Sequence, residues 1–195
     1  MAALGNLLQS YGEGIRLIFG GVAFVLLLLL LCKAIFFPQV LKEEFSNPIG
    51  AGVTATFPMA LMLFSVYAKP FVPGIAFPLW CVAILLQILL LLYFTKTYVL
   101  HFEEKNVHTV WYIVYVGIVV ASLTSPAYKM QALGQGIFYF GFIALLILLV
   151  VVSKRYLKMP VPEPAKPLMM IYAAPMALCT AGYNQAFAEK NQGFV

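Results

Sequence analysis

The residues best suited to metal binding or acid–base chemistry gather in one short polar segment of the sequence. They are two histidines and two glutamates: His101, Glu103, Glu104 and His108. Zinc sites use histidine and carboxylate ligands, so this spacing could serve a metal ion. Lys105 stands among these side chains, and long apolar runs flank the segment. We therefore interpret it as a solvated connection between two helices, and predict neither a metal ion nor an organic cofactor.

Enzymatic chemistry finds little support elsewhere in the sequence. There is no aspartate, and the seven glutamates all fall in predicted loops or at predicted membrane boundaries. The usual motifs of serine hydrolases, zinc proteases, phosphate-binding loops and dinucleotide folds do not occur. The cysteines Cys32, Cys81 and Cys179 are isolated, which is typical of small apolar residues in helices. The sequence therefore predicts that the protein is not an enzyme.

Composition indicates where such a chain can fold. Of 195 residues, 63% are hydrophobic and 10% are charged, whereas soluble domains have about 45–50% apolar and about 25% charged residues. This composition excludes a disordered chain, a cytosolic enzyme and a disulfide-rich secreted domain. The net charge of +5 comes from scattered basic residues, so it does not indicate nucleic-acid binding. The class of protein that fits this composition is a polytopic membrane protein.

Six segments are long and apolar enough to cross a bilayer, which takes about 20 residues of helix. They cover about 17–37, 50–68, 77–95, 108–126, 133–153 and 167–187. An unbroken leucine block, Leu26–Leu31, is unlike the alternation of a membrane β-barrel. We therefore expect a single all-α transmembrane domain that covers the whole chain, 1–195.

Two kinds of predicted span alternate along the chain. The spans at 17–37, 77–95 and 133–153 are rich in leucine and nearly free of polar side chains, as lipid-facing helices are. The other three contain helix breakers and hydroxyl groups, which are stable in a membrane only against other helices or water. We expect these three to be inner helices around a pore. The candidate pore-lining residues are Thr54, Pro58, Gly117, Ser122, Pro175 and Thr180.

The helix breakers recur at a regular interval. Pro58, Gly117 and Pro175 lie mid-span and are 59 and 58 residues apart. This interval predicts a repeated hairpin of one outer and one inner helix. The alternative is that the interval reflects only the length of a two-helix unit, because any series of such units in one bilayer tends toward a similar interval. Extended toward the N-terminus, the interval makes residues 1–9 the end of a truncated inner helix.

Basic residues predict the orientation of the chain. The connections after the outer helices hold eight lysines and arginines, and the opposite side holds four. Short loops rich in lysine and arginine stay in the cytoplasm. The connections at 38–48, 96–107 and 154–166 are therefore expected there, and the end of the chain from Lys190 to Val195 is expected outside.

Four stretches of the sequence resemble the tellurite-resistance/dicarboxylate transporter family. This family includes bacterial tellurite-resistance proteins, a fungal malate permease and the plant guard-cell slow anion channels. The stretches are MAALGNLLQSYG, KEEFSNPIGAGVTATFPMALMLFS, HTVWYIVYVGIVVASLTSPA and EPAKPLMMIYAAPMALCTAGY. Together with the matching order of outer helices, the similarity extends over essentially the whole chain.

The resemblance implies ten helices in five hairpins, with kinked inner helices around a pore and three subunits around a threefold axis. It places this chain from the end of the first helix to the seventh. Helices eight to ten, and the phenylalanine that occludes the family's pore, then have no counterpart in the sequence. Because three inner helices border only an arc of such a pore, we expect the 195-residue chain by itself neither to conduct anions nor to form a stable trimer.

The resemblance also implies a function. We expect passage of small anions or organic acids between the inner helices of a multi-pass protein of the bacterial plasma membrane. A homotrimer is the expected full-length assembly, and nucleic acid is not an expected partner. A coupled C4-dicarboxylate carrier is one alternative, which the lack of a predicted buried carboxylate or histidine weakens. A non-functional truncated fragment of such a transporter is another.

Overall fold

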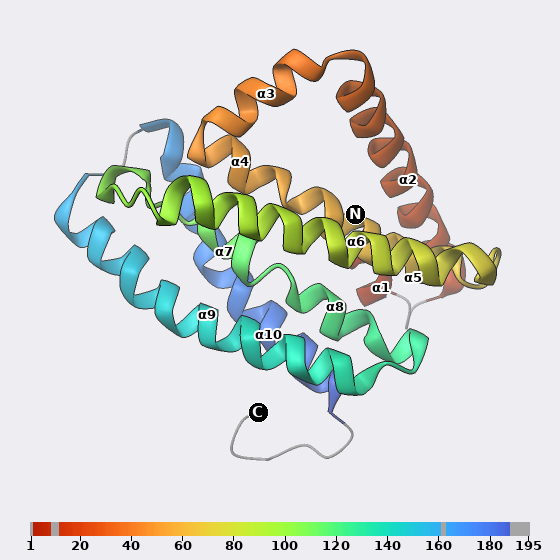
Figure 1. Cartoon of the computed structure of the whole chain (residues 1–195). Coiled ribbons are helices and arrows are strands. Elements are labelled where there is room, and N and C mark those ends of the chain that lie inside the picture. The colour runs from red at the N-terminus through yellow and green to blue at the C-terminus, as the bar shows by residue number, and fades with distance from the viewer. Residues whose placement is uncertain (1, 9–11, 161–162, 188–195) are drawn as a thin grey trace.

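The computed structural model describes residues 2–8, 12–160 and 163–187 of the chain. Within these ranges every regular element is a helix, which confirms the predicted all-α fold (Figure 1). The α-helices are α1 (Ala2–Leu7), α2 (Glu13–Phe36), α3 (Pro38–Ser46), α4 (Pro48–Thr54), α5 (Thr56–Ala68), α6 (Pro73–Phe94), α7 (Val110–Tyr115), α8 (Val119–Thr124), α9 (Gln131–Lys158) and α10 (Ala173–Ala186). Shorter π- or 3₁₀-helical segments are η2 (Thr95–Val99), η3 (Glu104–Asn106), η4 (Ser125–Tyr128) and η5 (Glu163–Tyr172).

Four helical segments in the described ranges are long and apolar enough to cross a bilayer. They are α2, α4 with α5 (Pro48–Ala68), α6 with η2 (Pro73–Val99), and α9. They coincide with four of the six predicted spans. The predicted spans at 108–126 and 167–187 fold as shorter helices in series, α7 with α8 and η5 with α10. The chain is therefore an integral multi-pass membrane protein, and the number of six spans stays a prediction.

The helices α2, α6 and α9 turn large apolar side chains outward. Leu29 of α2, Leu85 of α6 and Ile143 of α9 are 60%, 56% and 58% exposed. Water would solvate such a surface poorly, whereas the hydrocarbon of a bilayer is its natural solvent. The leucine block Leu26–Leu31 follows this pattern except at Leu27, which is buried in the core, and at Leu31, which is partly buried against it. The leucine-rich spans thus form the outer surface, as their composition predicts.

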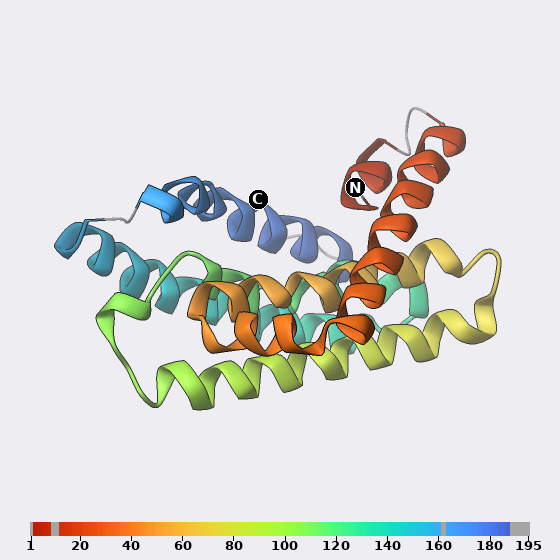
Figure 2. The ribbon, with the colours of Figure 1, turned by 90° about the horizontal axis from the view of Figure 1, so that it is seen from above.

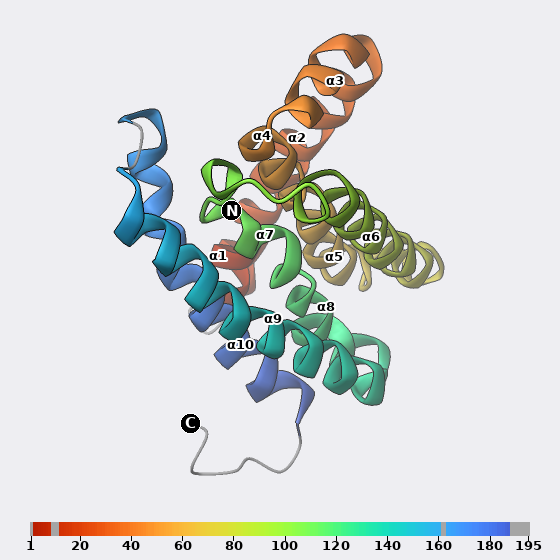
Figure 3. The ribbon, with the colours of Figure 1, turned by 60° about the vertical axis from the view of Figure 1, so that its left-hand side comes forward.

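The interior is built around α8, which packs against α5, α9 and α10. Figure 3 shows α7 and α8 between α5 and α6 on one side and α9 and α10 on the other. Every side chain from Val119 to Ser122 is buried. The inner helix predicted for 108–126 is therefore enclosed by its neighbours.

Most of the connections gather at two ends of the bundle, and the α2–α3 junction lies apart from both (Figure 1). Figures 1 and 2 show the α3–α4 junction, the segment from η2 to α7 and the end of α9 on one side, and the α5–α6 and η4–α9 junctions on the other. At the first end Lys158 donates to Glu104, with 2.9 Å between Nζ and Oε1. At the second end Lys69 donates to the backbone carbonyl of Ala127. These junctions fall into the two sets of connections from which the orientation is predicted, but most of the predicted connection at 38–48 folds as α3.

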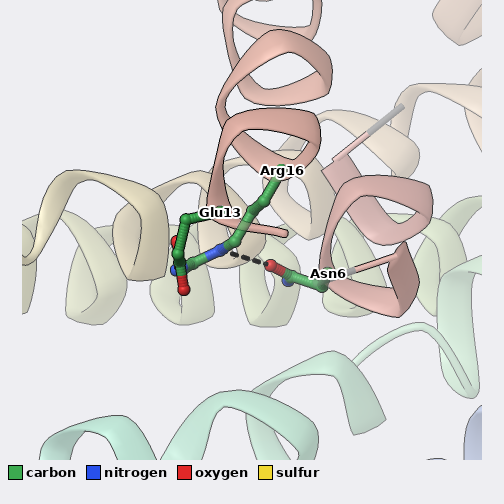
Figure 4. A network of polar contacts seen from close by, with 3 residues as sticks. All are labelled: Asn6, Glu13 and Arg16. Atoms are coloured by element: carbon green, nitrogen blue, oxygen red, sulfur yellow. Dashed lines mark hydrogen bonds and ion pairs between the residues drawn. The ribbon is translucent and has the colours of Figure 1, made fainter. Parts of the chain in front are cut away.

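The N-terminal helices meet through a small polar network (Figure 4). Arg16 of α2 donates from Nε to Asn6 of α1 and from Nη1 to Glu13, over 3.3 Å in each case. Its guanidinium carbon lies 4.8 Å from the centre of the Tyr67 ring on α5. These contacts hold α1 against its neighbours. That α1 is the end of a truncated helix stays a prediction, and residues 1 and 9 of that predicted segment lie outside the described ranges.

Candidate functional site

The first inner helix is interrupted between α4 and α5. Proline lacks an N–H, and in a regular helix the ring of Pro58 would collide with the carbonyl of Thr54, so the regular helix cannot continue through this turn. The hydroxyl of Thr54 donates to the Ala51 carbonyl over 2.7 Å. The hydroxyl of Thr56 donates to the Val53 carbonyl over 2.8 Å. These hydroxyls bind backbone acceptors at a depth where water would be scarce. Thr54 is half-buried and Pro58 is buried.

The second inner helix is interrupted between α7 and α8, at Gly117. The N–H groups of Val116 and Gly117 both donate to the carbonyl of Tyr112, over 2.8 and 3.2 Å. A Cβ at Gly117 would collide with the Ile113 carbonyl and would lie 2.6 Å from the sulfur of Met59 on α5. The backbone turn and the neighbouring helix therefore both require glycine at this position.

A buried glutamine from the outer helix α6 binds the backbone beside this second break. Gln87 donates from Nε2 to the carbonyl of Val114 over 2.9 Å, and also reaches that of Ile113 at 3.5 Å. Both carbonyls precede the break, where regular helical donors are lost. Gln87 is not among the predicted site residues. The signal in the sequence is a single amide within an apolar span, which must find a partner inside the membrane.

The third inner segment changes from 3₁₀- to α-helix at Ala173, two residues before Pro175. Pro175 is buried and has no N–H to continue the backbone pattern. Thr180 is exposed on α10, and its hydroxyl donates to the Met176 carbonyl over 3.0 Å. The change of helix type thus lies close to the predicted kink.

Close packing makes these three segments contiguous. Gly117 lies against Met59 of α5. On the other side of α8, a Cβ at Gly182 of α10 would lie 3.6 Å from the Cβ of Ser122. The Ser122 hydroxyl itself donates to the Gly134 carbonyl of α9 over 2.5 Å. The inner segments therefore follow one another in space in the order α5, α8, α10.

The four side chains considered as metal ligands are dispersed. Glu103 and Glu104 each pair with a lysine. His101 is exposed, whereas His108 is buried. No group of three His, Cys, Asp or Glu residues in the described ranges is placed to hold a metal ion.

Comparison with protein families connects these interrupted helices to a known family. A family model described as voltage-dependent anion channel matches residues 2–192. This match covers nearly the whole chain, including all three interrupted segments. No curated protein matches the sequence.

Proposed function

The chain belongs to the voltage-dependent anion channel family, and on this premise we propose that it transports small anions along its broken inner helices. This is the tellurite-resistance/dicarboxylate transporter family that the four stretches of sequence resemble. The observation that carries the proposal is the contiguity of the three interrupted segments in one bundle: α4–α5, α7–α8 and η5–α10.

Electrostatics favour an anion over a cation on such a path. An ion in a membrane needs polar groups in place of water, and fixed charge of its own sign excludes it. Interrupted helices offer backbone groups and hydroxyls. The glutamates of the described ranges lie in α3, in η5, in the connections or at the start of α2. Lysines at both ends of the bundle add a positive potential.

Six residues are proposed to border this path, in three roles. Pro58, Gly117 and Pro175 are buried and act by interrupting their helices. Thr54 is half-buried and Thr180 is exposed, and we expect their hydroxyls to face the ion, each turning its hydrogen from the backbone carbonyl to the anion. Ser122 completes the set; its hydroxyl holds α8 against α9.

Cysteine accessibility tests the path. In a cysteine-free variant, we would introduce Thr54→Cys or Thr180→Cys and compare small anionic and cationic water-soluble thiol reagents. A path for anions predicts that both positions react in membranes, and react faster with the anionic reagent. Leu29→Cys, on the outward face of α2, is the control and should not react, because hydrocarbon excludes both reagents.

Flux into liposomes reconstituted with the protein tests the transport itself. Flux of nitrate or chloride without a second gradient supports a channel. Flux of malate that requires a proton or cation gradient would support the coupled carrier instead. Reaction at positions 54 and 180 without flux would support an accessible path but count against transport by this chain. The absence of both thiol reaction at these positions and anion flux would overturn the proposal.

The same premise extends to the assembly and its location. We propose a homotrimer in the bacterial plasma membrane. The apolar outward faces of α2, α6 and α9 support this, because they provide surface for lipid and for neighbouring subunits. The mass of the protein in lipid nanodiscs distinguishes a trimer from a monomer.

A further inference from the structure

The two arginines of this chain differ in their hydrogen-bond partners. Arg16 has Glu13 and Asn6 as partners (Figure 4). Arg155, near the end of α9, is only 5% exposed, and neither its Nε nor its Nη1 has an acceptor among the described residues. A guanidinium keeps its charge at every physiological pH, and a buried charge is unfavourable unless acceptors offset it. Arg155 therefore indicates a place where negative charge binds.

The surroundings of Arg155 supply further donors. His108, in the connection before α7, is 6% exposed, and its Nδ1 has no partner within the described ranges. The next residue in the chain, Thr109, is bound to Tyr156, the residue that follows Arg155. The guanidinium carbon lies 5.0 Å from the centre of the Tyr156 ring. The Tyr156 hydroxyl in turn accepts from the N–H of Thr109 over 3.2 Å. These contacts hold Arg155 and His108 at one place between α9 and the start of α7.

Three of the glutamates at this end of the bundle are already paired. Each carboxylate has a lysine partner: Glu103 with Lys105 at 3.1 Å, Glu104 with Lys158 at 2.9 Å, and Glu163 with Lys166 at 2.5 Å. None of these ion pairs includes Arg155. Because the guanidinium is buried, a small free anion fits it better than a phosphate attached to a lipid.

Tyrosine rings connect this place with the second helix break. The ring centres of Tyr156 and Tyr172 are 5.9 Å apart, and those of Tyr172 and Tyr112 are 5.6 Å apart. The hydroxyl of Ser153 lies 3.3 Å from that of Tyr172. The Tyr112 hydroxyl is buried with no partner in the described part of the chain. The Tyr112 carbonyl accepts from the N–H of Gly117 at the break.

We propose that Arg155 and His108 form a binding site for a small anion, either inorganic or a short carboxylate. The guanidinium and imidazole N–H groups donate to the anion, and the Tyr156 ring holds the guanidinium from one side. The hydroxyls of Tyr172 and Tyr112 lead from this site to the α7–α8 break. Their role in the path rests on the proposed transport function, whereas anion binding at Arg155 does not depend on it.

Nitrate binding to the purified full chain tests the site. Binding is followed as thermal stabilisation at constant ionic strength, with gluconate as the replacement anion. We expect the wild-type response to saturate, and Arg155→Gln to raise the half-saturating nitrate concentration about tenfold or more, because charge-assisted hydrogen bonds are lost. Arg155→Lys should fall between the two, since it keeps the charge but loses the planar donors. An equal half-saturating concentration in R155Q and wild type would overturn the proposal.

Arg16→Gln is the matched control, because Arg16 already has a carboxylate partner. Its nitrate response should equal that of the wild type. If Arg155→Gln prevented folding, His108→Gln would decide the question with the arginine intact. We expect that variant to weaken nitrate binding about threefold or more, as for the loss of one hydrogen bond. An unchanged nitrate response in a folded H108Q variant would contradict the site.

Two further measurements distinguish a free anion from lipid phosphate as the ligand, and distinguish this site from the proposed transport function. Loss of the nitrate response in nanodiscs of anionic lipid, but not of neutral lipid, would support the site and assign lipid phosphate as a ligand. Nitrate binding without flux would support this site and count against transport. Flux that is unchanged in R155Q, despite weaker binding, would remove Arg155 from the path.

Discussion

Single polar side chains hold the interrupted helices to their neighbours. Gln87 of α6 donates to the Val114 carbonyl over 2.9 Å. Trp80, also of α6, donates to a threonine hydroxyl of α8 over 2.8 Å. Gln135 of α9 donates to the Ala186 carbonyl at the end of α10 over 3.0 Å. Inside a membrane no water competes for these groups, so each bond helps to fix the position of one helix against another.

Replacement of Gln87 by leucine tests this at the scale of one residue. Gln87→Leu keeps a side chain of similar size but leaves the Val114 carbonyl without its donor. We expect the free energy of unfolding to fall by about 1–2 kcal/mol, measured by titration with SDS. Gln131→Leu is the control, because Gln131 is exposed at the start of α9. Equal stability of Q87L and wild type would show that the bond from Gln87 does not stabilise the fold.

At the scale of whole elements, glycines set how closely the helices approach. Val119 of α8 lies between two of them. A Cβ at Gly182 of α10 would be 2.6 Å from one methyl of Val119, and a Cβ at Gly141 of α9 would collide with the other. Valine is rigid about χ1, so neither methyl can turn away without meeting the opposite helix. The packing of α8 between α9 and α10 therefore depends on these glycines.

We expect Gly182→Ala to lower the free energy of unfolding by about 1–3 kcal/mol, as for overpacking of a core. In the Val119→Ala background the same change should cost less, because the clashing methyl is gone. Gly136→Ala on α9 is the control: its Cβ would meet nothing within 4 Å, and it should be neutral or stabilising, since alanine favours helix. The double-mutant cycle from SDS unfolding measures the coupling. An absence of coupling between positions 119 and 182 would contradict this packing.

At the scale of the whole molecule, most of the connections form two groups at opposite ends of the bundle (Figure 2). The end with the Lys158–Glu104 ion pair contains the connections that carry most of the basic residues. The opposite end includes the contact from Lys69 to the Ala127 carbonyl. In the membrane, the end richer in lysine and arginine is expected to face the cytoplasm.

Cysteine labelling in intact cells measures this orientation. In a cysteine-free background, Gly74→Cys should react with a membrane-impermeant reagent added outside, and Glu104→Cys should react only after the cells are opened. Glu104 makes an exposed ion pair, so its replacement should cost little stability. Reaction at position 104 but not at position 74 in intact cells would reverse the predicted orientation.

Several features of this protein follow from its sequence alone. Long apolar runs must fold as helices in a bilayer, because only helices satisfy every backbone group within such a segment. Pro58 predicts an interruption because it has no N–H, and Gly117 predicts the second break. The leucine block predicts a helix on the outer surface. Each of these conclusions depends on groups within one segment, which a sequence displays directly.

Only the tertiary structure decided which polar side chains are buried and what they meet. Arg155 counts in the sequence as one of the basic residues that predict orientation, yet its side chain is buried. Gln87 lies in an apolar span, yet it donates to the backbone of α7. The hydroxyl of Ser122, predicted to line a pore, donates to α9. Burial and pairing depend on neighbours that packing brings from distant parts of the chain, and a pattern within one segment does not contain those neighbours.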